Sequence, residues 1–136
     1  MKKNFLIFSI ISYVISLVTP VFSYIPPDFT RSETFGYQYA GLGWMMIAAP
    51  LDFITWLCNL SLIVSWIIYK KDLAKYLAYF TVIPMLFYGL DYVLKPDLYA
   101  MTEYRKIPIG YVFWLLSGLL NAYFFYVKNK ESASGI

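Results

Sequence analysis

Long apolar stretches occupy most of the chain, and their lengths predict four helices that cross a lipid bilayer. Two stretches, residues 5–25 and 107–127, contain no charged side chain, and two others, residues 35–69 and 76–94, contain one each, Asp52 and Asp91. A helix needs about 20 apolar residues to cross the hydrocarbon core of a membrane. We therefore expect membrane spans at residues 5–25, 47–69, 73–94 and 107–127.

Lysine and arginine residues are distributed unevenly around these spans. Seven of the eleven lie near one set of span ends: Lys2, Lys3, Lys70, Lys71, Lys75, Lys128 and Lys130. The other four lie in two loops, residues 26–46 and 95–106. Positively charged residues accumulate on the cytoplasmic side of membrane proteins. We therefore expect both termini in the cytoplasm and both of these loops outside.

The first span has a second interpretation, as a secretory signal peptide. Two lysines precede its apolar core, and Ser23 provides a small residue at a cleavage position. Its apolar stretch is longer than a typical signal core of about 7–15 residues, which favours a retained helix. If cleavage occurred, a mature protein beginning at Tyr24 would keep three spans.

Prolines refine the limits of the spans. Because proline suits the first position of a helix, Pro50 is expected to open the main part of the second helix and Pro108 to open the fourth. Residues 41–49 would then approach the membrane as an interfacial or partly re-entrant segment. Pro20 and Pro84 are expected inside the first and third spans.

The composition agrees with a membrane protein and excludes several kinds of site. Hydrophobic residues make up 60% of the chain and charged residues 14%, whereas soluble domains carry about 25% charged residues. No length remains for a soluble domain, so residues 1–136 form one domain. The absence of histidine removes the usual general base and the commonest metal ligand. We expect no catalytic residues, no metal, no cofactor and no nucleic-acid partner.

Asp52 and Asp91 are the first candidates for a functional site, because an ionisable group within a membrane span is costly. Asp52 would lie in the first turn of its helix, where the positive helix end favours a carboxylate. Asp91 would lie about one turn from the outer end of its span, at a similar depth. The two aspartates are either anchors paired with Lys95, Arg105 or Lys106, or the floor of an outward-facing polar pocket.

Deeper in the spans, the polar side chains are amides and hydroxyls. Asn59 shares a helical face with Asp52 and Thr55, and Asn121 shares one with Ser117. Such groups need hydrogen bonds within the protein, so we interpret them as contacts between helices. A path for protons or ions is the alternative, but proton relays normally use carboxylates or histidines.

Three neighbouring loop residues, Tyr104, Arg105 and Lys106, are the remaining candidates for a binding site. Tyrosine and arginine are enriched among the residues that dominate protein interfaces. The same composition also suits contact with lipid headgroups, which the outer face of a membrane protein meets. Together with Asp52, Asn59 and Asp91, these residues make up the predicted binding region, on the outer half of the molecule.

The second span carries a pattern that resembles a known group of proteins. The pattern consists of Gly43 and Trp44, then Trp56, Leu57, Cys58 and Asn59, and finally Ser65 and Trp66. Small four-span bacterial membrane proteins, many of them uncharacterised, are similar in having Gly-Trp and Trp-Leu-x-Asn in this span. The resemblance covers about a fifth of the chain. It implies a four-helix fold in a bacterial inner membrane and assigns no catalytic residue.

These observations predict an all-α integral membrane four-helix bundle with several candidate functions. The leading hypothesis is a non-enzymatic protein that binds another protein in the bilayer or at its outer face. It would be an immunity protein against a membrane-directed toxin or an accessory subunit of an envelope complex. The alternative is a small oligomeric transporter or channel with Asp52 and Asp91 at a polar pocket. An enzyme acting on lipid or quinone is least favoured. Membrane lipids are expected partners in every case.

Overall fold

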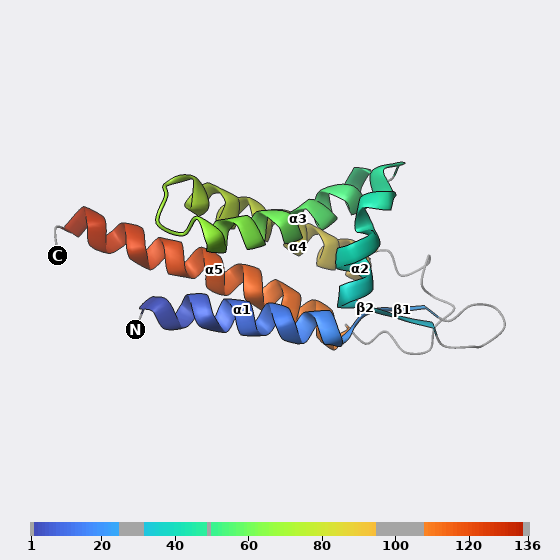
Figure 1. The fold of residues 1–136 in the computed structure, drawn as a ribbon. Coiled ribbons are helices and arrows are strands. Elements are labelled where there is room, and N and C mark those ends of the chain that lie inside the picture. The colour runs from blue at the N-terminus through green and yellow to red at the C-terminus, as the bar shows by residue number, and fades with distance from the viewer. Residues whose placement is uncertain (1, 25–31, 49, 95–107, 135–136) are drawn as a thin grey trace.

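The computed structural model describes residues 2–24, 32–48, 50–94 and 108–134, and it is mostly helical, as the sequence predicts (Figure 1). The long helices are α1 (Lys2–Val18), α3 (Pro50–Ile67), α4 (Leu73–Leu94) and α5 (Ile109–Ser134). The shorter elements are strands β1 (Pro20–Tyr24) and β2 (Ser32–Phe35), helix α2 (Gly36–Leu42) and the 3₁₀ helix η1 (Gly43–Ala48).

The first long helix ends earlier than predicted. It ends at Val18, and the hydroxyl of Thr19 donates a hydrogen bond to the carbonyl of Ile15 at 2.8 Å. A residue that precedes a proline avoids the helical conformation, so the helix cannot easily continue into Pro20. The prediction that Pro20 lies inside the first span is therefore wrong, whereas Pro84 does lie inside α4.

The residues after α1 form a strand that the sequence analysis did not predict. β1 pairs with β2 in an antiparallel hairpin, with Phe22 opposite Thr34 and Tyr24 opposite Ser32. A short apolar stretch is compatible with either a buried strand or a continuing helix, and periodicity alone cannot separate them. Residues 20–24, expected in the first span, therefore pair with residues 32–35, and helices α2 and η1 occupy residues 36–48, where we expected a loop and, at residues 41–49, an interfacial or partly re-entrant segment.

The starts of the last three long helices agree better with the prediction. α3 begins at Pro50, as expected. At the start of α5, the carbonyl of Pro108 accepts hydrogen bonds from the backbone amides of Tyr111 at 3.0 Å and Val112 at 3.3 Å. Proline therefore precedes the first turn of this helix, which continues beyond the predicted limit of residue 127 to Ser134.

The long helices pack as two antiparallel pairs. α1 lies along α5, α3 lies along α4, and α4 also contacts α5 (Figure 1). The start of α1, the end of α5 and the α3–α4 turn all lie at one end of the molecule, on the left in Figure 1. The hairpin, α2 and η1 lie at the opposite end. We call these four short elements, residues 20–24 and 32–48, the outer cap, after the side of the membrane on which the sequence predicts the loop of residues 26–46.

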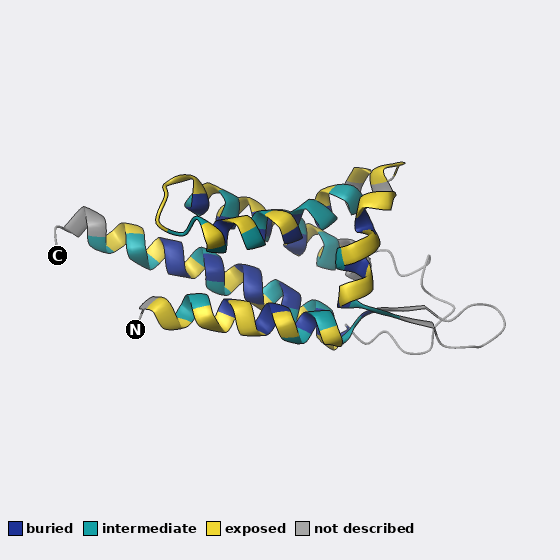
Figure 2. Cartoon of the chain, in the orientation of Figure 1, coloured by how far each residue is buried: buried dark blue, intermediate teal, exposed yellow. Residues whose placement is uncertain are grey.

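The exterior of the bundle is apolar, and many of its buried residues are polar (Figure 2). Large hydrophobic side chains are exposed along every long helix, for example Val14 at 53%, Ile67 at 74% and Phe87 at 66%. The buried polar residues are Ser9, Ser12, Ser16, Thr55, Asn59, Ser65, Thr81, Ser117 and Asn121. A soluble monomer rarely exposes contiguous apolar surface of this extent.

Two helices in the described part of the chain are long and apolar enough to cross a membrane. Their apolar segments are Leu73–Leu90 in α4 and Ile109–Glu131 in α5. The corresponding segments of α1 and α3, Lys3–Val18 and Asp52–Ile67, are apolar but shorter. By length and composition, then, two of the four predicted spans meet the usual requirement for a membrane helix.

Candidate functional site

The predicted site residue Asn59 lies at the centre of the bundle, in a hydrogen bond between two long helices. The indole Nε1 of Trp114 in α5 donates to Asn59 Oδ1 in α3 at 2.8 Å. Asn59 Nδ2 in turn donates to the carbonyl of Trp56 at 3.2 Å. Asn59 is only 5% exposed, so both polar ends of its amide are used within the protein.

Further hydrogen bonds extend from this pair through the other helices. Trp56 Nε1 donates to the carbonyl of Ala40 in α2 at 2.8 Å. Ser9 Oγ in α1 donates to the carbonyl of Ser117 in α5 at 2.7 Å, and Trp66 Nε1 in α3 donates to Ser9 Oγ at 3.1 Å. We call Ser9, Trp56, Asn59, Trp66, Trp114 and Ser117 the interior network. It joins α1, α2, α3 and α5 through three indole donors and the hydroxyl of Ser9.

A second amide lies in the same interior but is not fully satisfied. Asn121 Nδ2 donates to Ser65 Oγ at 2.7 Å, and Ser65 Oγ donates to the carbonyl of Leu62 at 2.7 Å. Asn121 is fully buried, and its Oδ1 has no hydrogen-bond partner. The predicted role of Asn59 and Asn121 as contacts between helices agrees with these bonds.

A small cavity lies next to Asn59, where the outer cap meets the bundle. Its volume is about 20 Å³, and Tyr13, Tyr39, Asn59 and Tyr111 are among the side chains that line it. A cavity of this size has room for one water molecule at most. It is therefore too small to accommodate a lipid, a quinone or another organic substrate.

Tyr39 connects the outer cap to the first turn of α3. Its hydroxyl donates to the backbone carbonyl of Asp52 at 3.2 Å. Burial, and then the nearby Asp52 carboxylate, raise the pKa of the Tyr39 phenol, because both disfavour the phenolate. The phenol consequently stays protonated and remains a hydrogen-bond donor throughout the physiological pH range.

The other predicted site residues are only partly described by the structure. Asp52 lies in the first turn of α3, as predicted. Asp91 lies in the last turn of α4, at the same end of the α3–α4 hairpin, but its side chain is outside the described part. Tyr104, Arg105 and Lys106 also lie outside the described residues. The proposed outer binding region of these residues therefore stays a prediction.

The sequence analysis did not identify the buried polar face of α1, although the signal for it was present. Ser9, Ser12 and Ser16 occur at intervals of three and four residues, which places them on one face of a helix. All three are buried. Serine at this spacing in an apolar helix indicates the side that contacts other helices.

The residues of the Gly-Trp and Trp-Leu-x-Asn pattern are linked in the structure. A Cβ atom added to Gly43 would overlap the indole ring of Trp56, so glycine is required for this close approach. Trp56 binds Ala40, and Asn59 binds Trp114. Trp44, in contrast, is 57% exposed. Gly43 and Trp56 thus hold the outer cap on α3, and Asn59 joins α3 to α5.

We expect the replacement of Asn59 by leucine to lower the free energy of unfolding by about 1–2 kcal/mol, because the Trp114 indole loses its acceptor. A double-mutant cycle with Trp114→Phe should give a coupling energy of about 0.6–1.7 kcal/mol. The measurement is unfolding of the purified protein in mixed detergent micelles. Asn129→Leu, at an exposed position of α5, is the control. Additive effects of the two interior substitutions would contradict a direct bond.

Neither a cluster of metal ligands among the described residues nor a similarity to known proteins indicates a further functional site. Among residues 2–24, 32–48, 50–94 and 108–134, no group of three or more cysteine, aspartate or glutamate side chains is placed to hold a metal ion. No family model, no curated protein and no solved structure matches the chain.

Proposed function

We propose that the chain is a multi-pass protein of a bacterial inner membrane that acts, without catalysis, by binding another protein in the bilayer or at its outer face. An immunity protein against a membrane-directed toxin and an accessory subunit of an envelope complex are the two forms of this function. The observation that carries the proposal is an apolar bundle exterior with a structured cap at one end. The apolar exterior suits contact with lipid, and the cap offers a structured surface to a protein partner.

The exposure of the long helices supports the membrane placement. Only 22% of Leu73–Leu90 and 39% of Ile109–Glu131 is buried inside the molecule. The core helix of a soluble protein would be mostly buried, whereas a helix in lipid needs no such cover. The interior hydrogen bonds support the same placement, because helices in lipid associate through packing and polar contacts rather than through the hydrophobic effect.

The shorter helices α1 and α3 are included as spans in this proposal. With 17 and 18 residues, each is about 26 Å long at 1.5 Å per residue. A bilayer adapts to a deficit of a few ångströms by local thinning at modest cost. We also propose that α1 is retained, since Ser9 binds both Ser117 and Trp66 in the interior.

The outer cap provides the recognition surface. Tyr37, Trp44, Met45 and Ile47 are 57–71% exposed on α2 and η1. Aromatic residues and methionine are enriched at protein interfaces. The interior bonds from Tyr39 and Trp56 hold the cap in one position. A preorganised surface loses less conformational entropy on binding, which favours affinity.

The interior supports binding over transport. The side chains of the interior network are hydrogen-bonded to one another or to backbone carbonyls, and the cavity beside Asn59 holds one water molecule at most. A solute path through these residues would have to break bonds between helices. Helix packing is therefore the role that we assign to Asn59 and Asn121.

Site-specific photo-crosslinking in living cells tests the binding proposal. A photoreactive residue at Tyr37, Trp44 or Ile47 is expected to give a discrete adduct with one partner protein. The same residue at Ile67 or Leu73, the last residue of α3 and the first of α4, serves as the control and should not give that adduct. Both positions are more than half exposed and flank the α3–α4 turn, at the end of the molecule opposite the cap. Adducts that are absent, or identical at cap and control positions, would refute the recognition role of the cap.

The predicted outer loop of residues 95–106 supplies a second arm of this test. Joint replacement of Tyr104, Arg105 and Lys106 by alanine is expected to weaken recovery of the partner after crosslinking from the cap. The predicted loop residues and the cap belong to the same outer side in the proposed topology. Undiminished recovery would remove these three residues from the binding surface.

A further inference from the structure

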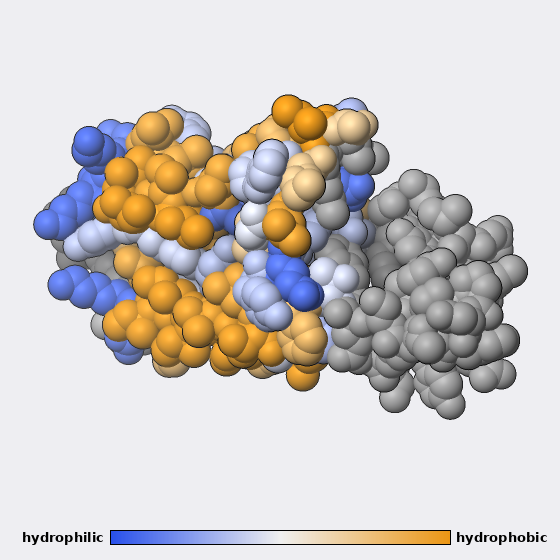
Figure 3. All heavy atoms as spheres, turned by 45° about the vertical axis from the view of Figure 1, so that its right-hand side comes forward, coloured by the Kyte–Doolittle hydropathy of each residue, from blue (hydrophilic) through white to orange (hydrophobic). Residues whose placement is uncertain are grey.

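The end of the molecule opposite the outer cap carries a dense group of lysines. Its described members are Lys3, Lys70, Lys71, Lys75, Lys128 and Lys130, against the carboxylates of Asp72 and Glu131. Figure 3 shows hydrophilic residues at the left-hand end of the molecule, directly beside an apolar surface. In the proposed membrane placement, these lysines lie at the level of the lipid headgroups.

Aromatic rings position several of these ammonium groups. Lys75 Nζ lies 5.0 Å from the ring centroid of Tyr76, and Lys70 Nζ lies 5.9 Å from that of Tyr69. Long lysine side chains near a membrane surface extend along apolar surface and place their charge in the headgroup region. Tyrosines concentrate at the same level. The two residue types therefore mark one membrane boundary.

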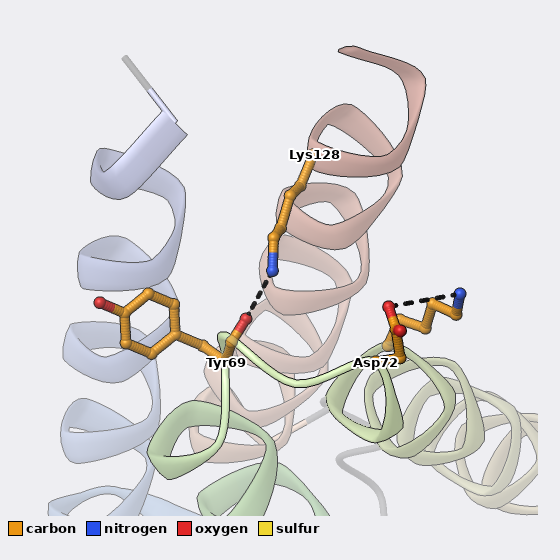
Figure 4. A network of polar contacts seen from close by, with 4 residues as sticks. Tyr69, Asp72 and Lys128 are labelled. Atoms are coloured by element: carbon orange, nitrogen blue, oxygen red, sulfur yellow. Dashed lines mark hydrogen bonds and ion pairs between the residues drawn. The ribbon is translucent and has the colours of Figure 1, made fainter. Parts of the chain in front are cut away.

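Lys128 and Lys75 are already engaged with protein groups. Lys128 Nζ donates to the carbonyl of Tyr69, just beyond the end of α3, at 2.8 Å (Figure 4). Lys75 Nζ lies 3.9 Å from Asp72 Oδ1, in the first turn of α4 (Figure 4). These contacts fix the shape of the turn between α3 and α4. They also hold the two ammonium groups against the protein, and Asp72 offsets the charge of Lys75.

Lys70 and Lys71 differ from these two lysines. Both are exposed in the α3–α4 turn, and neither pairs with a carboxylate of the described residues. They lie directly before α4, beside the apolar surface formed by Leu73 and Tyr76, which are 58% and 62% exposed. An anionic headgroup with acyl chains attached matches this combination of charge and apolar surface.

We propose that Lys70 and Lys71 bind the phosphate of an anionic phospholipid whose acyl chains lie along the start of α4. This inference rests on the membrane placement proposed above and is independent of the protein partner. A lysine near an anionic membrane surface strengthens attraction about fivefold, and the two together about 25-fold. Asp72, next to them, opposes the binding.

Lipid binding by the purified protein in a non-ionic detergent tests the proposal. Dioleoyl phosphatidylglycerol and dioleoyl phosphatidylcholine share their acyl chains, so native mass spectrometry with each reports the contribution of the headgroup. Wild-type protein is expected to bind the anionic lipid at least about tenfold more tightly, a preference that weakens as salt screens the charges. Equal binding of the two lipids would overturn the proposal.

Three variants test whether the preference for the anionic lipid comes from the α3–α4 turn. Lys70→Gln with Lys71→Gln should weaken binding of the anionic lipid about 25-fold, while Lys70→Arg with Lys71→Arg, which keeps both charges, should retain it. Asp72→Asn should strengthen binding. An unchanged affinity in the glutamine variant would overturn the proposal. The lipid-binding measurement contains no partner protein, so its result does not depend on the outcome of the crosslinking test. Crosslinking from the cap, in turn, does not depend on the lipid.

Discussion

Replacing Phe125 by alanine is expected to lower the free energy of unfolding by about 3 kcal/mol. Phe125 is 1% exposed and belongs to a buried cluster with Ala74, Ala78 and Phe124. The two alanines of α4 leave room for its ring, so truncation creates a cavity that the helix backbones cannot close. In lipid, the hydrophobic effect contributes little to this loss of stability, because lipid tails are as apolar as the protein core. The loss comes from the packing contacts of the Phe125 ring that alanine cannot make.

The adjacent residue provides the matched control for this substitution. Tyr126 is 56% exposed on the outside of the same helix, and its replacement by alanine should cost less than about 1 kcal/mol. Both variants are measured by unfolding in mixed detergent micelles, with circular dichroism reporting the loss of helix. Equal losses at the two positions would mean that α5 does not present this face to α4.

Replacing Gly36 by alanine is expected to destabilise the attachment of the outer cap by about 2–3 kcal/mol. An added Cβ atom would overlap the backbone carbonyl of Ser16 and lie 2.8 Å from the Cα atom of Leu17. Backbone atoms of α1 cannot move aside as a flexible side chain can. The Gly36 amide also donates to the carbonyl of Thr19 at 3.2 Å, so the start of α2 is held against the end of α1.

Gly41, five residues further along α2, is the control for Gly36. No atom lies within 4 Å of a Cβ added there, and alanine favours a helix over glycine by about 1 kcal/mol. Amide hydrogen exchange of residues 36–48 is therefore expected to accelerate in Gly36→Ala and to stay the same or slow in Gly41→Ala. The first variant should also lose the crosslinks from the cap. Unchanged exchange in Gly36→Ala would contradict this packing.

The positions of the long helices could be predicted because they depend on local properties of the chain. Apolar residues in runs of helical length, with Pro50 at the start of α3, were sufficient to locate the helices. The hairpin could not be predicted in this way. Residues 20–24 carry no charge and continue the uncharged stretch of the helix before them, and they become a strand because Pro20 stops α1 and residues 32–35 provide a partner.

The candidate site could be predicted only in part, for a related reason. Asn59 was recognisable as a buried amide in an apolar helix, but its partner Trp114 lies 55 positions away in the sequence. Ser9 and Ser117 are separated by 108 positions. The rotation of each helix about its own axis determines which of these groups meet, and a sequence pattern reports only the face that each residue occupies.

By itself, the sequence determined the helical character of the chain, the places of its four long helices and the uneven distribution of its lysines. These properties follow from the hydropathy of neighbouring residues and from proline, which act over a few positions. Only the tertiary structure decided the hairpin, the position of the outer cap and the partners in the interior network. Those depend on contacts between distant segments, because each buried polar group is stabilised by whichever donor or acceptor packing brings within reach.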